Sequence, residues 1–134
     1  MISFPIERSI ADEGIILFDA ILDKNINVRL AFDTGASHTT IDSNSLLMAG
    51  YDISNPLATM EVETSNGVIN VDVVEIEIFT AFGLTKKCFP IQIYDFFAHG
   101  IVSEYEGVLG LDFLDELHFC LNLKSNLISI ETGK

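Results

Sequence analysis

The chain has 134 residues, of which 49% are hydrophobic and 20% are charged. This length suits one domain over residues 1–134, and the high apolar content excludes an intrinsically disordered chain. The formal net charge of −13, with only seven scattered Lys and Arg residues, argues against nucleic acid or an anionic membrane surface as a partner.

Apolar residues alternate with a period of two through much of the sequence, and turn-forming residues interrupt them at short intervals. This pattern predicts strands. In the first part of the chain we expect strands within 2–6, 15–22 and 28–32, the last two being joined by a turn at 23–25. Residues 46–48 would close a short turn or helix.

A hairpin is predicted at Ser65-Asn66-Gly67, because Asn-Gly supplies the positive φ angles of a type I′ turn. Beyond this turn the apolar phase slips by one residue, from the series that ends at Val73 to the series that starts at Val74. Such a slip turns side chains to the opposite face of a sheet unless a bulge or bend absorbs it. We therefore expect a long, bent strand.

The later elements are short and are bounded by turn-forming residues. In chain order they are a turn at 80–83, a strand at 84–94, a loop at 95–106, a helix at 112–117 and two strands around 124–126. Asp112 is the expected N-cap of the helix, because Asp side chains accept hydrogen bonds from the first helical amides. The sequence therefore predicts an all-β fold with one short α-helix.

The opening residues and the cysteines bear on the cellular environment. The start, MISFPIERS, lacks the basic and apolar regions of a secretory signal, and the most apolar later run, 15–22, is short and broken by Asp19. We therefore expect no membrane span and a cytoplasmic location. Cys88 and Cys120 lie far apart without the spacing of a zinc site or a disulfide scaffold, so two buried reduced thiols are expected.

Residues 32–41 read FDTGASHTTI and place Asp33 directly after an apolar run. A buried carboxylate costs several kcal/mol unless its charge is satisfied. Two aspartates held about 3 Å apart share a proton and can activate a water. Gly35 allows close backbone approach, and Thr34 offers a hydroxyl that can fix the loop. Asp33 is therefore a candidate catalytic carboxylate, and the alternative is a structural Asx-type turn.

Three segments occur in a recognisable order: FDTGASHTTI, the hairpin tip at 65–67, and GVLGLDFL at 107–114. Together they resemble the retropepsin-type aspartic proteases, the family of retroviral proteases and their cellular and bacterial relatives. The resemblance covers the chain from about Ile15 to its end. It implies a retropepsin-like closed β-barrel, the acid protease fold, and peptide hydrolysis by an activated water. It also implies no metal, no cofactor and no covalent intermediate.

The resemblance assigns roles to individual residues. Asp33 would be the catalytic aspartate, Thr34 the hydroxyl that clasps its counterpart across an interface, and Gly35 the residue that lets the backbone turn. The other assigned residues are Ala36 and Ser37 in support of the active-site loop, Ser65, Asn66 and Gly67 in a flap, and Val108, Leu109 and Gly110 in the hydrophobic-hydrophobic-Gly element that braces the loop. As a polar loop residue, Ser37 also needs no special role.

Only one DTG occurs in the chain, whereas the implied mechanism needs two aspartates. A homodimer on a twofold axis resolves this mismatch, because the axis places one Asp33 from each copy side by side. The expected partners are therefore a second copy and a peptide or protein substrate. Two alternatives stay open: a catalytically quiet dimerisation or peptide-binding module with this fold, and a hydrolase on the same scaffold that acts on one partner only.

Overall fold

The structure is a computed structural model that describes residues 1–11, 13–101 and 103–131. Its elements in chain order are β1 (Ile2–Pro5), β2 (Glu7–Arg8), β3 (Ile16–Leu22), β4 (Ile26–Phe32), β5 (Thr40–Asp42), α1 (Ser43–Met48), β6 (Ala58–Thr64), β7 (Gly67–Ala81), β8 (Leu84–Tyr94), a 3-10 helix (Phe97–His99), β9 (Gly107–Leu109), α2 (Leu111–Leu114), β10 (Phe119–Asn122) and β11 (Leu127–Ile130). None of the helices in these ranges is long and apolar enough to cross a membrane.

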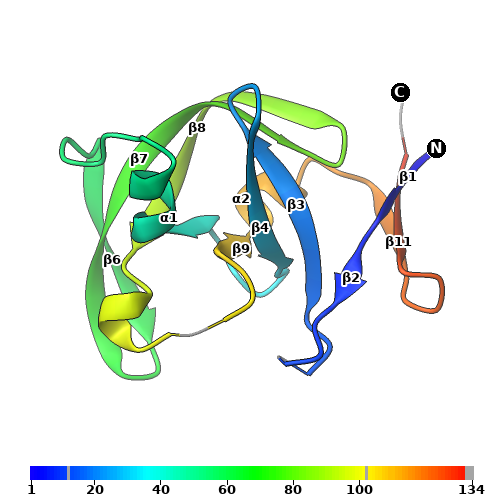
Figure 1. The fold of residues 1–134 in the computed structure, drawn as a ribbon, viewed down its shortest axis with the longest axis horizontal. Coiled ribbons are helices and arrows are strands. Elements are labelled where there is room, and N and C mark those ends of the chain that lie inside the picture. Colours follow the sequence, from blue (N-terminus) through cyan, green and yellow to red (C-terminus); the bar gives the residue numbers. More distant parts are fainter. Residues whose placement is uncertain (12, 102, 132–134) are drawn as a thin grey trace.

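Six strands close into a barrel in the order β3, β4, β9, β5, β8 and β7, with β7 returning to β3 (Figure 1). The β4–β9 and β5–β8 pairs are parallel, and the other pairs are antiparallel. Closure removes sheet edges that would otherwise carry unpaired backbone groups. The sheet continues beyond the barrel into β2 at one end and β6 at the other. The predicted all-β closed barrel is confirmed.

Aromatic and aliphatic side chains fill the barrel. Phe79 and Phe113 are fully buried with ring centroids 5.4 Å apart, and the Phe89 ring lies 4.9 and 5.9 Å from them. Rings at these separations contribute beyond the apolar area that they bury. Because Phe113 belongs to α2, this cluster fixes the helix that follows β9 against the strands.

The long bent strand predicted after the hairpin is present as β7, which runs unbroken over 15 residues. Val73 and Val74, where the apolar pattern slips by one residue, are both buried. The strand therefore has apolar surroundings on both of its faces at this point. The first part of β7 pairs with β6, and its last part pairs with β3. Figure 1 shows β7 curving from the β6–β7 hairpin over the barrel.

The predicted hairpin exists, but its turn type differs from the prediction. Thr64 pairs with Gly67, so the two turn residues are Ser65 and Asn66. The positive φ angle falls on Gly67, at +112°. The prediction of a type I′ turn at Asn66-Gly67 is therefore wrong, because strand pairing places Gly67 in the first position of β7.

Two consecutive residues with positive φ angles, as in a type I′ turn, occur instead between β7 and β8. Ala81 pairs with Leu84, and the two residues between them have φ angles of 51° (Phe82) and 79° (Gly83). A left-handed φ is costly for a bulky side chain. Burial of the Phe82 ring, 4.5 Å from that of Phe18, offsets this cost.

The described residues contain two short α-helices and a 3-10 turn rather than one helix, and the turn or helix expected at 46–48 is the second half of α1. The Asp42 side chain caps α1 by accepting a hydrogen bond from the Asn44 amide at 3.3 Å. The second helix begins after Gly110, and Asp112 lies in its first turn. Asp112 is therefore not the N-cap that the sequence predicted, because its carboxylate bonds to another segment.

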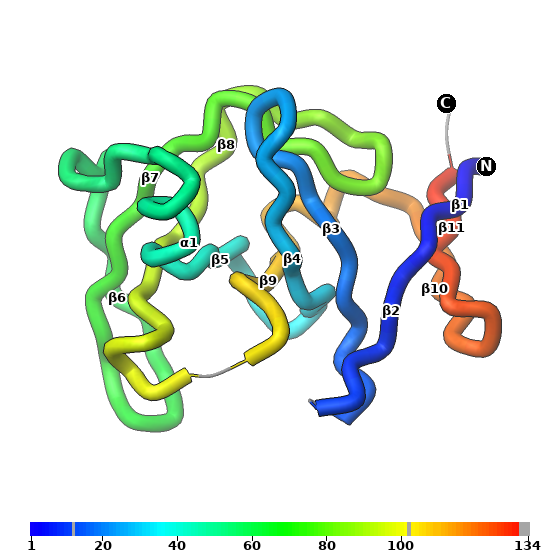
Figure 2. The backbone as a smooth tube through the Cα atoms, viewed as in Figure 1, coloured from blue at the N-terminus to red at the C-terminus, as the bar shows by residue number. Residues whose placement is uncertain are grey.

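A separate three-stranded sheet, in the order β1-β11-β10, joins the two ends of the described chain. Figures 1 and 2 place this sheet at one end of the molecule and the β6–β7 hairpin at the opposite end. The strands predicted around 124–126 are thus confirmed as β10 and β11. The barrel separates the terminal sheet from the hairpin.

Both cysteines are free and exposed, so the prediction of buried thiols is wrong. Side chains alternate between the two faces of a strand. Phe119 packs against the core, which leaves its neighbour Cys120 on the solvent face of β10. Cys88 is exposed beside the buried Phe89, at a position where the backbone takes a left-handed φ of 53°.

Tyr51 connects the segment after α1 to the β3–β4 turn through a hydrogen bond. Its hydroxyl donates to Asp23 Oδ2, and Asp23 Oδ1 accepts from the Ile78 amide at 3.3 Å. Burial raises the pKa of Tyr51 above its ordinary value, and the hydrogen bond and charge of Asp23 raise it further. The carboxylate thus links the β3–β4 turn to the loop before β6.

We expect Tyr51→Phe to lower the free energy of unfolding by about 1 kcal/mol at neutral pH, the usual net value of one hydrogen bond. Because the folded-state pKa lies above the unfolded value of about 10, the contribution is complete below pH 10 and is lost as the pH rises through the folded pKa. Urea unfolding of both proteins between pH 7 and 11 checks this. A difference in stability that grows above pH 10 would contradict it.

Candidate functional site

Asp33 follows the last residue of β4, at the point where β4 lies parallel to β9. Its amide donates to the Leu109 carbonyl at 3.1 Å, and its Oδ1 accepts from the Gly35 amide at 2.8 Å. A Cβ on Gly35 would lie 3.2 Å from that same oxygen, so the absent side chain permits the close approach. Within the described part of the chain Oδ2 receives no hydrogen bond. The half-buried carboxylate therefore keeps one oxygen available.

The segment that joins β9 to α2 holds the loop after Asp33 in place. The amides of Leu111 and Asp112 donate to the carbonyls of Ala36 and Ser37 at 2.8 and 3.2 Å. A Cβ on Gly110 would lie 2.7 Å from the His38 carbonyl carbon and 2.8 Å from the Ala36 oxygen. Only glycine fits there, so the structure brings the Val108-Leu109-Gly110 element against the loop.

Thr39 and Asp112 form a hydrogen-bonded clamp between the loop and α2. The Thr39 amide and hydroxyl donate to the two Asp112 carboxylate oxygens at 2.9 and 2.8 Å, and the same hydroxyl accepts from the Gly110 amide at 3.1 Å. Thr39 is fully buried. Lys86 adds a hydrogen bond to the Asp112 carbonyl at 2.8 Å.

This clamp was not predicted from the sequence. Asp112 was expected to be a helix cap, and no particular role was predicted for Thr39. The sequence offered one signal, the acidic Asp112 inside the apolar segment GVLGLDFL, because a carboxylate among apolar residues needs a nearby donor.

Thr39→Val is expected to lower the free energy of unfolding by about 1–3 kcal/mol, because it leaves a part-buried carboxylate oxygen and the Gly110 amide unsatisfied at almost unchanged volume. The matched control is Thr40→Val, since the Thr40 hydroxyl makes one long contact, 3.4 Å to Gln92, among the described residues. Urea denaturation of the three proteins measures the difference. Equal stability of the two variants would show that the clamp contributes nothing.

Two cavities flank the Asp33 loop. The first, of about 450 Å³, lies between residues 35–38 of the loop and residues 60–63 of β6. The second, of about 390 Å³, is lined by Asp33 itself together with Phe32, Ile16 and Tyr105. Val108 lines both. Among the described residues that line them, none belongs to the predicted hairpin tip at 65–67.

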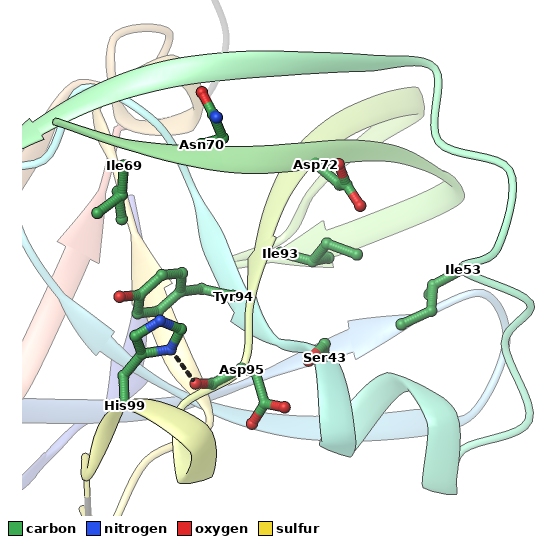
Figure 3. Close-up of a pocket in the computed structure, with 9 residues that line it drawn as sticks. All are labelled: Ser43, Ile53, Ile69, Asn70, Asp72, Ile93, Tyr94, Asp95 and His99. Atoms are coloured by element: carbon green, nitrogen blue, oxygen red, sulfur yellow. Dashed lines mark hydrogen bonds between the residues drawn. The ribbon is translucent and has the colours of Figure 1, made fainter.

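A third cavity, of about 470 Å³, lies between β7, the end of β8 and the 3-10 helix (Figure 3). Within it the His99 ring stacks on the Tyr94 ring at 4.1 Å, and His99 Nδ1 lies 2.8 Å from the Asp95 carbonyl oxygen. A hydrogen bond from the Ala98 amide, with a second from the Asn44 side chain, lowers the pKa of the Asp95 carboxyl. These contacts fix the start of the 95–106 segment beside β7.

The arrangement around Asp33 limits its chemistry. One half-buried carboxylate lies on a braced loop, beside the cavity of about 450 Å³ that separates this loop from β6. A single carboxylate can act as a base or as an acid, whereas a proton-sharing pair needs a second one. Among the described residues no group of three His, Cys, Asp or Glu side chains is placed to hold a metal ion.

This combination of a closed barrel and a DTG loop braced by a Gly-helix segment defines a retropepsin-like aspartic protease fold. The sequence profile of a family described as aspartyl protease matches residues 19–113, which is more than half of the chain. The chain therefore belongs to this aspartyl protease family. No curated protein sequence matches it.

Solved structures show the same fold at low sequence identity. A retropepsin-like aspartic protease from Rickettsia conorii has a TM-score of 0.68 and 18% identity, over 96% of this chain and 89% of that one. EIAV protease in complex with the inhibitor HBY-793 has a TM-score of 0.60 and 13% identity, over 78% of this chain and 88% of that one. The retroviral protease-like domain of Ddi1 from Leishmania major has a TM-score of 0.56 and 15% identity, over 87% of this chain and 88% of that one.

Proposed function

We propose that the chain is an aspartic endopeptidase whose catalytic carboxylate is Asp33. The observation that carries this proposal is the half-buried Asp33 side chain, held by the Gly35 amide on a loop that is clamped through Thr39 and Asp112. A rigid carboxylate with one available oxygen suits general acid–base catalysis, which needs a positioned group rather than a mobile one. Membership of the aspartyl protease family supports the same activity.

The proposed active site contains two copies of the chain. Thr34 and Gly35 are exposed at the centre of the loop, which leaves their surface open to a second loop across a twofold axis. The two Asp33 carboxylates would share one proton, so that one acts as base and the other as acid toward a water held between them. That water attacks the peptide carbonyl, and the proton passes to the leaving nitrogen.

The β6–β7 hairpin is the proposed flap, with Ser65, Asn66 and Gly67 at its tip. The cavity between β6 and residues 35–38 is then the place where substrate lies extended. The tip residues do not line this cavity, so we propose that they cover the substrate only when the hairpin moves or when the second copy is present.

A catalytically quiet peptide-binding module is the alternative function. One observation favours it: the bond from the Gly35 amide to Asp33 is the Asx-turn geometry that a purely structural aspartate also adopts. The two functions differ in whether peptide bonds are broken. Incubation of the purified protein with a peptide library, followed by mass spectrometry, decides between them. Cleavage at defined bonds supports the protease, whereas retention of peptides without cleavage supports the module.

A further inference from the structure

Strand β6 presents a free edge to the proposed substrate cavity. In the eight-stranded sheet formed by the described residues, β6 is the last strand and pairs with β7 alone, and Figure 1 shows no strand of these residues beyond it. Its outward amides and carbonyls are therefore open to pairing with an extended chain. The cavity beside it also reaches residues 35–38 of the Asp33 loop. A peptide that pairs with β6 thus lies next to the proposed catalytic loop.

The side chains of β6 divide into two kinds along this edge. Met60 and Val62 point to one face of the hairpin, and Glu61 and Glu63 point to the other, because side chains alternate along a strand. All four line the cavity. Across the hairpin Glu61 faces Asn70 and Glu63 faces Val68, so neither carboxylate has a cation opposite it on β7.

Among the residues that the structure describes, no Lys, Arg or His forms an ion pair with either carboxylate. The sequence contains no Lys or Arg between Arg29 and Lys86. Among the described residues that line the cavity none is Lys or Arg, and the imidazole of His38 is the one group there that can become positive. Lys86 lies 2.8 Å from Glu116 and 2.8 Å from the Asp112 carbonyl, so its charge is already engaged.

We propose that this groove selects peptides that carry Lys or Arg at two positions separated by one apolar residue. A peptide strand paired with β6 places alternate side chains on the face of Glu61 and Glu63, and the residue between them on the face of Met60 and Val62. This inference rests on the proposed function for the place of the substrate, and it names the substrate class of that site.

The test compares three fluorescein-labelled decapeptides that differ only at three central positions: Lys-Val-Lys, Gln-Val-Gln and Val-Lys-Lys. Binding is measured by anisotropy with the Asp33→Asn protein, so that no hydrolysis is needed, and cleavage is measured with the wild-type protein. The binding series is repeated with Glu61→Gln/Glu63→Gln in the same background. The matched control is Glu75→Gln/Glu77→Gln, which neutralises two exposed carboxylates on β7 that do not line the cavity.

The Lys-Val-Lys peptide should bind roughly fivefold more tightly than Gln-Val-Gln, since each opposite-charge pair between strands adds about a twofold to fivefold preference. The ratio of the dissociation constants of these two peptides should fall to about one in Glu61→Gln/Glu63→Gln and should remain near fivefold in the control variant. Equal binding of the two peptides, a ratio unchanged in Glu61→Gln/Glu63→Gln, or equally tight binding of Val-Lys-Lys would overturn the inference. Selective binding without cleavage would refute only the proposed protease activity. Cleavage without charge preference would refute only the proposed selection of basic peptides.

Discussion

Replacing Asp33 with Asn is expected to lower kcat/KM for any cleaved peptide by at least about a thousandfold, within the range that general acid–base groups contribute. Asparagine keeps the shape of the side chain, and its oxygen can still accept from the Gly35 amide, which bonds Asp33 Oδ1 at 2.8 Å. It cannot share a proton or take one from water. The substitution therefore removes the chemistry and leaves the loop in place.

The measurement for this prediction is the initial rate of cleavage of one peptide by wild type and by Asp33→Asn, with unfolding curves for both. Asp52→Asn is the matched control, because Asp52 is exposed and, within the described part of the chain, accepts hydrogen bonds from Ser54 alone. The control should keep full activity. Turnover by purified Asp33→Asn within tenfold of wild type would refute the assignment of Asp33.

Deleting residues 1–5 is expected to weaken association of the proposed homodimer by at least about tenfold, and activity should fall with it. This segment contains β1, the outer strand of the terminal sheet, and its first two side chains are 76% (Met1) and 50% (Ile2) exposed. Leu121 and Leu123 are also exposed on or beside the same sheet. Apolar side chains and a free strand edge at one surface favour pairing with another copy.

A dimer defect and a folding defect are separable for the truncated protein. Loss of β1 also removes Phe4, whose ring lies 6.0 Å from that of Phe82, so some stability is lost. A protein that fails only to dimerise regains activity as its concentration rises, whereas an unfolded one does not. Sedimentation and activity are therefore measured together over a concentration series. An unchanged dimer at low concentration would contradict the prediction.

Local patterns allowed the strands and the position of Asp33 to be predicted. The strand expected at 84–94 is β8 with the same bounds. The alternation of apolar and polar residues between turn-formers is a local pattern, which can be seen directly in the sequence. The phase slip at Val73 and Val74 likewise appears in the sequence before the bend appears in β7. Where a structural cause lies within a few residues of its effect, sequence reasoning was sufficient.

Contacts between distant segments could not be predicted in this way. The Thr39–Asp112 clamp joins residues 73 positions apart, and β1 pairs with β11 across most of the chain. The left-handed conformation of Phe82 likewise depends on its packing against Phe18. Tertiary packing decides these features, and a local pattern carries no information about which partner a buried side chain meets.

Mixing wild-type and Asp33→Asn chains tests most directly the central claim that two Asp33 side chains from two copies form one active site. With random exchange of subunits and a ninefold excess of the mutant, about one in ten wild-type chains keeps a wild-type partner. Activity should then fall to about one tenth of that of the same amount of wild type alone, at concentrations where all chains are dimeric. Activity that stays unchanged after exchange, while sedimentation shows mixed dimers, would contradict it.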